Sequence, residues 1–138
     1  MAEANNGNWQ TASRWRELLG SDHAVRIVGR WPDEAASGDQ LMLALHARRS
    51  AASIAAWAQA RGSKGLAVVL AATDLYQDIA FDAQAQQSLK LAHRLVVLQE
   101  DGLAALPPDV RERGRVIYQS TEALAPLAKP STHLQVVM

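Results

Sequence analysis

The residues of this chain that are best suited to chemistry fall into a few short polar segments. His46 precedes two arginines, Arg48 and Arg49, in the sequence HARRS at residues 46–50. A guanidinium group binds phosphate or carboxylate through paired N–H donors, so this segment predicts an anion site. Adjacent helical residues point about 100° apart, so we expect one arginine to bind and the other to face solvent. His46 either hydrogen-bonds a ligand oxygen or packs as an ordinary lone histidine.

A second segment, Thr73 and Asp74, directly follows the longest apolar run, residues 65–72. We expect Asp74 to stand at the mouth of a cleft, where it either orients a hydroxyl group or caps the following helix. Gln99, Gln119 and Ser120 follow two other apolar runs. Their neutral donors and acceptors suit a polar ligand and suit their own loops equally well.

A third segment reads NNGNW at residues 5–9 and opens an amphipathic helix. Asn5, Asn6, Gly7 and Asn8 would leave backbone N–H groups free at the positive end of the helix dipole, where a phosphate or carboxylate can bind. The alternative is ordinary helix capping, because asparagine is among the best capping residues.

The elements that must position these residues alternate along the chain. Apolar periodicity predicts helices over residues 8–19, 50–62, 80–92 and 101–106, and one more turn at 109–113. Apolar runs of strand length lie at residues 24–31, 41–45, 66–72, 94–98, 115–118 and 134–138. Alternating strands and helices predict an α/β fold, a Rossmann-like parallel sheet with helices on both faces. Ligands of such sheets bind beyond the carboxyl ends of the strands, where the polar segments fall.

Composition excludes several classes of function. The chain has 138 residues, of which 14 are Lys or Arg and 14 are Asp or Glu, so its net charge is zero and binding to nucleic acid or an anionic membrane is not expected. It has no cysteine, and its four histidines are scattered, so we expect no metal site. The GxGxxG, P-loop and GxSxG motifs are absent. No secretory signal or membrane span is apparent, which favours a single cytoplasmic domain over residues 1–138.

Five blocks, in order, give a more specific indication: ANNGNWQTASRW, ALHARRSAASIAAW, ATDLYQDI, LVVLQEDGLAALP and RVIYQS. Together they resemble the amino-terminal half of bacterial selenosugar synthases of selenoneine biosynthesis, which are GT-B glycosyltransferases akin to family 4 enzymes. The resemblance runs from about residue 4 to the end of the chain.

This resemblance implies that selenophosphate attacks the anomeric carbon of a UDP-sugar and that UDP is released, with no metal cofactor. It places the acceptor largely on the amino-terminal domain, in a cleft lined by residues 5–9, Arg48, Arg49, Thr73 and Asp74. Two alternatives stay open. One is a GT-B enzyme with another acceptor, and the other is a non-catalytic α/β binding or assembly module.

The chain departs from the family pattern in two ways. Ala71 and Ala72 stand where family members typically have threonine and glycine. The family's first strand would precede residue 4, and the domain that binds the UDP-sugar would follow residue 138, so we expect no glycosyl transfer by the chain alone. Residues 121–132 would be a linker, and residues 133–138 an extra strand. We expect LQVVM, residues 134–138, to replace the lost central strand within one chain or by exchange in a homodimer.

Overall fold

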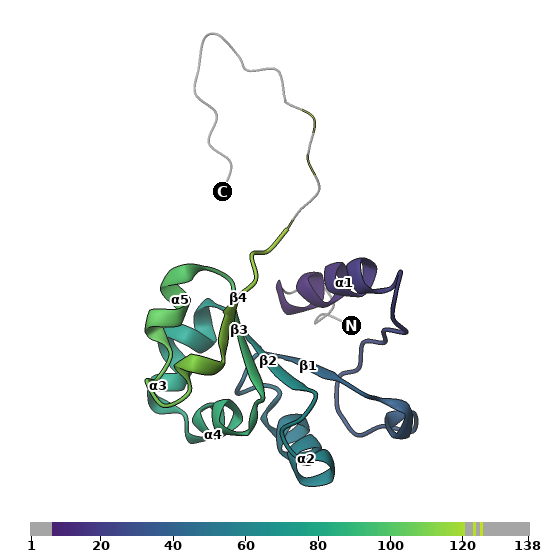
Figure 1. The fold of residues 1–138 in the computed structure, drawn as a ribbon, viewed down its shortest axis with the longest axis horizontal. Coiled ribbons are helices and arrows are strands. Elements are labelled where there is room, and N and C mark those ends of the chain that lie inside the picture. The colour runs from purple at the N-terminus through teal and green to yellow at the C-terminus, as the bar shows by residue number, and fades with distance from the viewer. Residues whose placement is uncertain (1–6, 121–122, 124, 126–138) are drawn as a thin grey trace.

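The computed structural model describes residues 7–120, 123 and 125. Its centre is an all-parallel sheet of four strands, β1 (Met42–Leu45), β2 (Leu66–Leu70), β3 (Arg94–Val97) and β4 (Gly114–Val116), which lie side by side in chain order (Figure 1). The register places Ala44 beside Val68, and Val68 beside Leu95. The predicted α/β, Rossmann-like fold is therefore confirmed.

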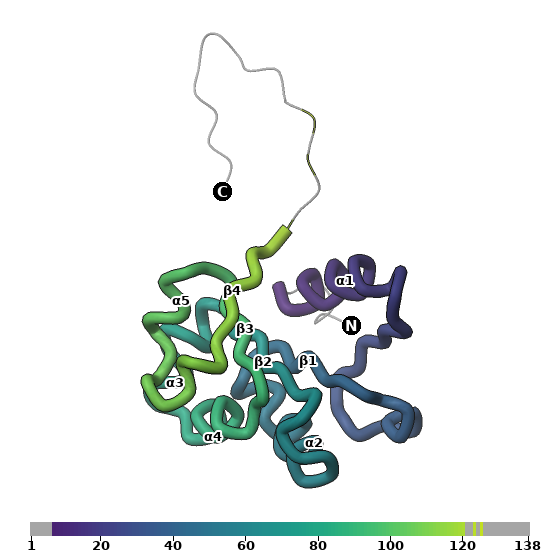
Figure 2. Tube along the Cα trace, in the orientation of Figure 1, coloured from purple at the N-terminus to yellow at the C-terminus, as the bar shows by residue number. Residues whose placement is uncertain are grey.

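Helices connect successive strands and cover the sheet. α2 (Ala51–Arg61) follows β1, α4 (Ala83–Leu91) follows β2, and α5 (Glu100–Ala105) follows β3. α1 (Gly7–Leu19) lies on the other side of the strands from α2 and α4 (Figure 1), and Figure 2 follows its long connection to β1. Within the described part of the chain, no helix is long and apolar enough to cross a membrane.

The region between β2 and α4 departs from the single helix expected over residues 80–92. A π-helical turn (Asp74–Asp78) and the short α3 (Ile79–Phe81) precede α4. Asp82 leaves the helical conformation, with φ −99° and ψ 116°, and its side chain accepts a hydrogen bond from the Ala85 N–H at 2.8 Å. This N-cap begins α4 as a separate helix, since the side-chain oxygen satisfies an N–H that has no partner within the helix.

The core lies between the sheet and the helices that connect its strands. Side chains from alternate strand positions meet those of α2 and α4 there, and each is at most 1% exposed: Ile54, Trp57, Leu66, Val68, Leu70, Leu89, Leu95 and Val97. Continuous apolar runs are typical of parallel strands because both of their faces are covered. This packing gives the carboxyl ends of the strands a fixed platform.

The strand predicted over residues 24–31 is wrong. The segment is irregular. Its Arg26 side chain pairs with Asp33 and Asp39, and the Trp31 N–H bonds the Ser53 hydroxyl at 3.0 Å. Trp31 also packs on Trp57, with ring centroids 5.0 Å apart. These contacts anchor the segment through side chains, whereas a strand needs a neighbouring edge with which to form a ladder.

The described sheet is continuous, because each strand from β1 to β4 pairs with the next one in the chain. It therefore has no internal gap of the kind expected from a lost central strand, and β1 forms one edge. The expected strand at residues 134–138 and most of the expected linker at 121–132 lie outside the described residues.

Candidate functional site

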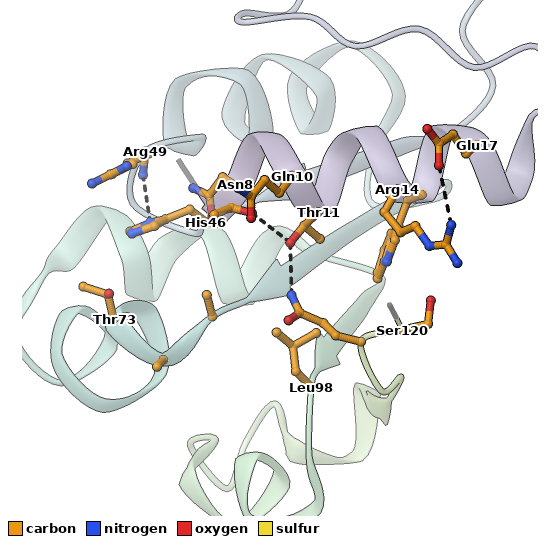
Figure 3. Close-up of a pocket in the computed structure, with 15 residues that line it drawn as sticks. Asn8, Gln10, Thr11, Arg14, Glu17, His46, Arg49, Thr73, Leu98 and Ser120 are labelled. Atoms are coloured by element: carbon orange, nitrogen blue, oxygen red, sulfur yellow. Dashed lines mark hydrogen bonds and ion pairs between the residues drawn. The ribbon is translucent and has the colours of Figure 1, made fainter. Parts of the chain in front are cut away.

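A cavity of about 1000 Å³ opens between α1 and the carboxyl ends of the strands (Figure 3). All four strand ends contribute to its wall: His46 and Arg49 after β1, Ala71, Ala72 and Thr73 after β2, Leu98 after β3, and Gln119 and Ser120 after β4. α1 contributes Gly7, Asn8, Gln10, Thr11, Arg14, Trp15 and Glu17. The cavity lies where the ligand of a parallel sheet normally binds.

The structure separates the two neighbouring arginines. Arg49 lines the cavity, whereas the Nε of Arg48 lies 3.3 Å from Oδ2 of Asp78 and its side chain is 47% exposed. Of the two arginines, only Arg49 is therefore among the residues that line the cavity.

Asp74 does not stand at the mouth of the cavity, so that expectation is wrong. Its side chain is fully buried in the π-helical turn behind the wall. Oδ1 accepts a hydrogen bond from the Ala47 N–H at 2.9 Å, and Oδ2 lies 3.4 Å from the Ala71 N–H. The carboxyl group turns inward because buried backbone N–H groups need an acceptor.

His46 is the direct partner of Asp74. Its Nδ1 lies 2.6 Å from Oδ1 of Asp74, and its side chain is 3% exposed. The Arg49 N–H also faces Nδ1, at 3.4 Å, but one ring nitrogen cannot both donate and accept. The shorter contact decides the assignment, so Nδ1–H donates to Asp74 and Nε2 carries the lone pair of the neutral ring.

Burial controls the protonation of this pair. It lowers the pKa of His46, the positive charges of Arg49 and Arg48 lower it further, and Asp78 opposes them. Burial also raises the pKa of Asp74 to about 6, against the backbone N–H donors, which favour the carboxylate. Near pH 7 the pair is therefore a neutral imidazole beside a carboxylate.

Sequence reasoning missed Asp78, the third member of this cluster. Its Oδ2 is buried and accepts no hydrogen bond, although it forms an ion pair with Arg48, and it lies 3.6 Å from Nε2 of His46. A usable signal was its spacing: Asp74 and Asp78 are four residues apart, which places them on one side of a helical turn.

His46, Asp74 and Asp78 could in principle hold a metal, because each offers a ligand atom and these atoms lie within 4.8 Å of one another. However, Arg48 already contacts Asp78, and the arginine charges that disfavour a proton on His46 also disfavour a dication. The arrangement is better suited to a hydrogen-bonded support behind the cavity wall.

α1 is tied to the segment after β4 on the opposite side of the cavity. The Gln119 side-chain amide donates to the Thr11 hydroxyl at 3.0 Å, and that hydroxyl donates to the Gly7 carbonyl at 2.9 Å. Arg14 pairs with Glu17 at 3.5 Å, at the end of the cavity away from His46 and Arg49 (Figure 3).

The remaining candidates are divided. Gly7, Asn8, Thr73, Gln119 and Ser120 line the cavity. Gln99 instead donates to the Tyr76 hydroxyl at 3.1 Å, and Asn5 and Asn6 lie outside the described residues.

Fold and site define an α/β protein with a cavity, lined by both polar and apolar residues, at the carboxyl edge of a parallel sheet. No protein-family model matches the chain, and no curated protein matches it either.

Proposed function

We propose that the chain is the acceptor-side domain of a glycosyltransferase that resembles selenosugar synthase and joins selenophosphate to the sugar of a UDP-sugar with release of UDP. The observation that supports this proposal is the cavity itself, which Arg49, His46 and Thr73 line together with the first residues of α1. The acceptor would bind there as an anion.

The electrostatics of the cavity favour an anion at the end near His46. Among the lining residues that the structure describes, Glu17 has the only carboxylate, and it pairs with Arg14 at the other end. Arg49 carries a permanent positive charge, and the hydroxyl group of Thr73, elsewhere on the cavity wall, can donate to a phosphate oxygen. The oxygen atoms of selenophosphate can accept hydrogen bonds from these donors.

Phosphate titration into the chain, followed by calorimetry and by amide NMR shifts, tests the anion site. We expect saturable 1:1 binding that Arg49→Ala weakens at least about tenfold, equivalent to about 1.4 kcal/mol. Arg94→Ala is the matched control, because Arg94 is an exposed arginine at the opposite end of β3. The proposal would be contradicted if phosphate did not bind the chain, or if Arg49→Ala and Arg94→Ala lowered the phosphate affinity equally.

A second titration addresses the reaction. Selenophosphate should bind at the same residues as phosphate, and the chain should release no UDP from UDP-glucose or UDP-N-acetylglucosamine when selenophosphate is present. UDP release by this chain alone would show that it is more than an acceptor-side domain. Tighter binding of sugar hydroxyl acceptors than of selenophosphate would favour a glycosyltransferase with another acceptor. The lack of cysteine suits the reducing cytoplasm, where we expect the enzyme to act.

A further inference from the structure

The turn that follows β1 is held in place by groups on other elements. The His46 N–H donates to the Val69 carbonyl of β2 at 3.0 Å. The Ala47 N–H donates to Asp74, and the Ala47 carbonyl accepts from the Ser88 hydroxyl of α4 at 2.8 Å. Both backbone groups of Ala47, two residues before Arg49, are thus hydrogen-bonded to side chains of other elements.

Asp74 contacts three donor groups with a single carboxyl group. Its Oδ1 lies within hydrogen-bond distance of the Ala47 N–H and of Nδ1 of His46, while Oδ2 faces the Ala71 N–H. Ala47 follows β1 and Ala71 follows β2, so the carboxyl group joins the carboxyl ends of two strands. It is fully buried, so water cannot readily replace it.

His46 shows why the turn needs this support. Its φ is 76°, in the left-handed region that side chains other than glycine rarely adopt. Such a backbone persists only where surrounding contacts over-determine it. The Asp74 contacts to the His46 ring and to the next N–H hold the chain in this conformation, which sets the position from which Arg49 reaches the cavity.

We propose that Asp74 is a positioning residue for oxyanion binding, acting through the turn that carries Arg49 without touching the anion. This inference rests on the proposed function, because it assumes that Arg49 binds the anion in the cavity. It assigns the specificity for an oxyanion to a preorganised turn as well as to the charge of Arg49.

Phosphate affinity of Asp74 variants tests the inference. Asp74→Ala should weaken phosphate binding about tenfold, since the turn loses the acceptor for two donors. Asp74→Asn should restore it to within about threefold, because its amide oxygen can still accept from Ala47 N–H and Nδ1–H. Asp82→Ala is the control: it removes the N-cap of α4 and should lower stability with phosphate affinity unchanged.

A double-mutant cycle separates positioning from general destabilisation. In the Arg49→Ala background, Asp74→Ala should cost less than about twofold, because there is no guanidinium left to position. Additive losses would overturn the inference. If phosphate does not bind the unsubstituted chain, the proposed function fails; if Arg49→Ala weakens binding and Asp74→Ala does not, only the positioning role fails.

Hydrogen exchange provides a measurement that does not need a folded Asp74→Ala variant. The Ala47 amide should be protected in the unsubstituted chain and in Asp74→Asn. Rapid exchange of this amide in either folded protein would overturn the positioning role.

Discussion

Nδ1 of His46 lies 2.6 Å from Oδ1 of Asp74, and both side chains are buried. The two residues follow different strands, β1 and β2, and their contact lies behind the wall of the cavity. An ionised carboxylate can only accept hydrogen bonds, so the contact is favourable because Nδ1 of the neutral imidazole carries a proton and donates a hydrogen bond to Asp74. The protonation of Asp74 should therefore be visible in the pH dependence of stability.

The first prediction concerns this pH dependence. The folded-state pKa of Asp74 is about 6, above the usual 3.8, so between these values the folded chain binds more protons than the unfolded chain. The Asp74 contribution to stability is then present below about pH 4 and is lost as pH rises through about 6. Urea unfolding should show that the unfolding free energy of the unsubstituted chain, minus that of Asp74→Asn, falls as pH rises from about 4 to about 6. A difference that rises with pH would contradict the raised pKa.

Gly102 provides a second prediction about how α5 seats on the sheet. A Cβ at this buried position would lie 2.8 Å from Cβ of Val97 and 3.1 Å from Cδ2 of Leu75. Gly102→Ala should therefore lower the unfolding free energy by about 1–3 kcal/mol, because α5 must move away from β3. Gly38→Ala is the control, since a Cβ there meets no described atom within 4 Å, and it should change stability by less than about 0.5 kcal/mol. If Gly102→Ala and Gly38→Ala changed the unfolding free energy equally in denaturant unfolding, the close packing of Gly102 against Val97 would be contradicted.

The third prediction concerns acid stability in the segment before β1. Arg26 holds the pKa values of Asp39 and Asp33 below the usual 3.8, and the Trp31 indole N–H also bonds Asp39, at 3.0 Å. Groups with lowered folded-state pKa values contribute stability above pH 3.8 that is lost as pH falls below it. The unfolding free energy of Asp39→Asn should therefore fall less steeply below pH 4 than that of the unsubstituted chain. Because Arg26 and Asp33 are exposed and Asp39 is only partly buried, 0.5 M NaCl should reduce the difference between the two proteins, and an effect that salt does not change would contradict the surface ion pair.

Local sequence patterns encode the buried strands of this fold but not every segment that resembles one. Buried parallel strands read as apolar runs, so β2 and β3 were predictable from residues 66–72 and 94–98. Residues 24–31 show similar alternation, but whether they form a ladder depends on a neighbouring edge that no local pattern encodes.

The candidate site was predictable to the level of strand ends and no further. Placing polar residues after strands correctly brought Arg49, Thr73 and Ser120 to one cavity. The inward turn of Asp74 depends on the unpaired N–H groups of Ala47 and Ala71, which only the folded chain brings near it. The role of Asp78 likewise appears only when His46 is placed beside it.

The last prediction concerns α1, which forms one wall of the cavity yet has no buried residue. Its hydrogen bond to the segment after β4 joins the Thr11 hydroxyl to the Gln119 amide. Thr11→Val keeps the shape of the side chain and removes the hydroxyl, so the docking of α1 should weaken by about 0.5–1.5 kcal/mol. The amides of α1 should then exchange about two- to tenfold faster, while those of β2 keep their rates, because α1 contributes little to the core. Thr11→Ser retains the hydroxyl and should restore the slower exchange. Faster exchange in β2 as well would mean that α1 is needed for the whole fold, and unchanged exchange in α1 would mean that other contacts hold this wall in place.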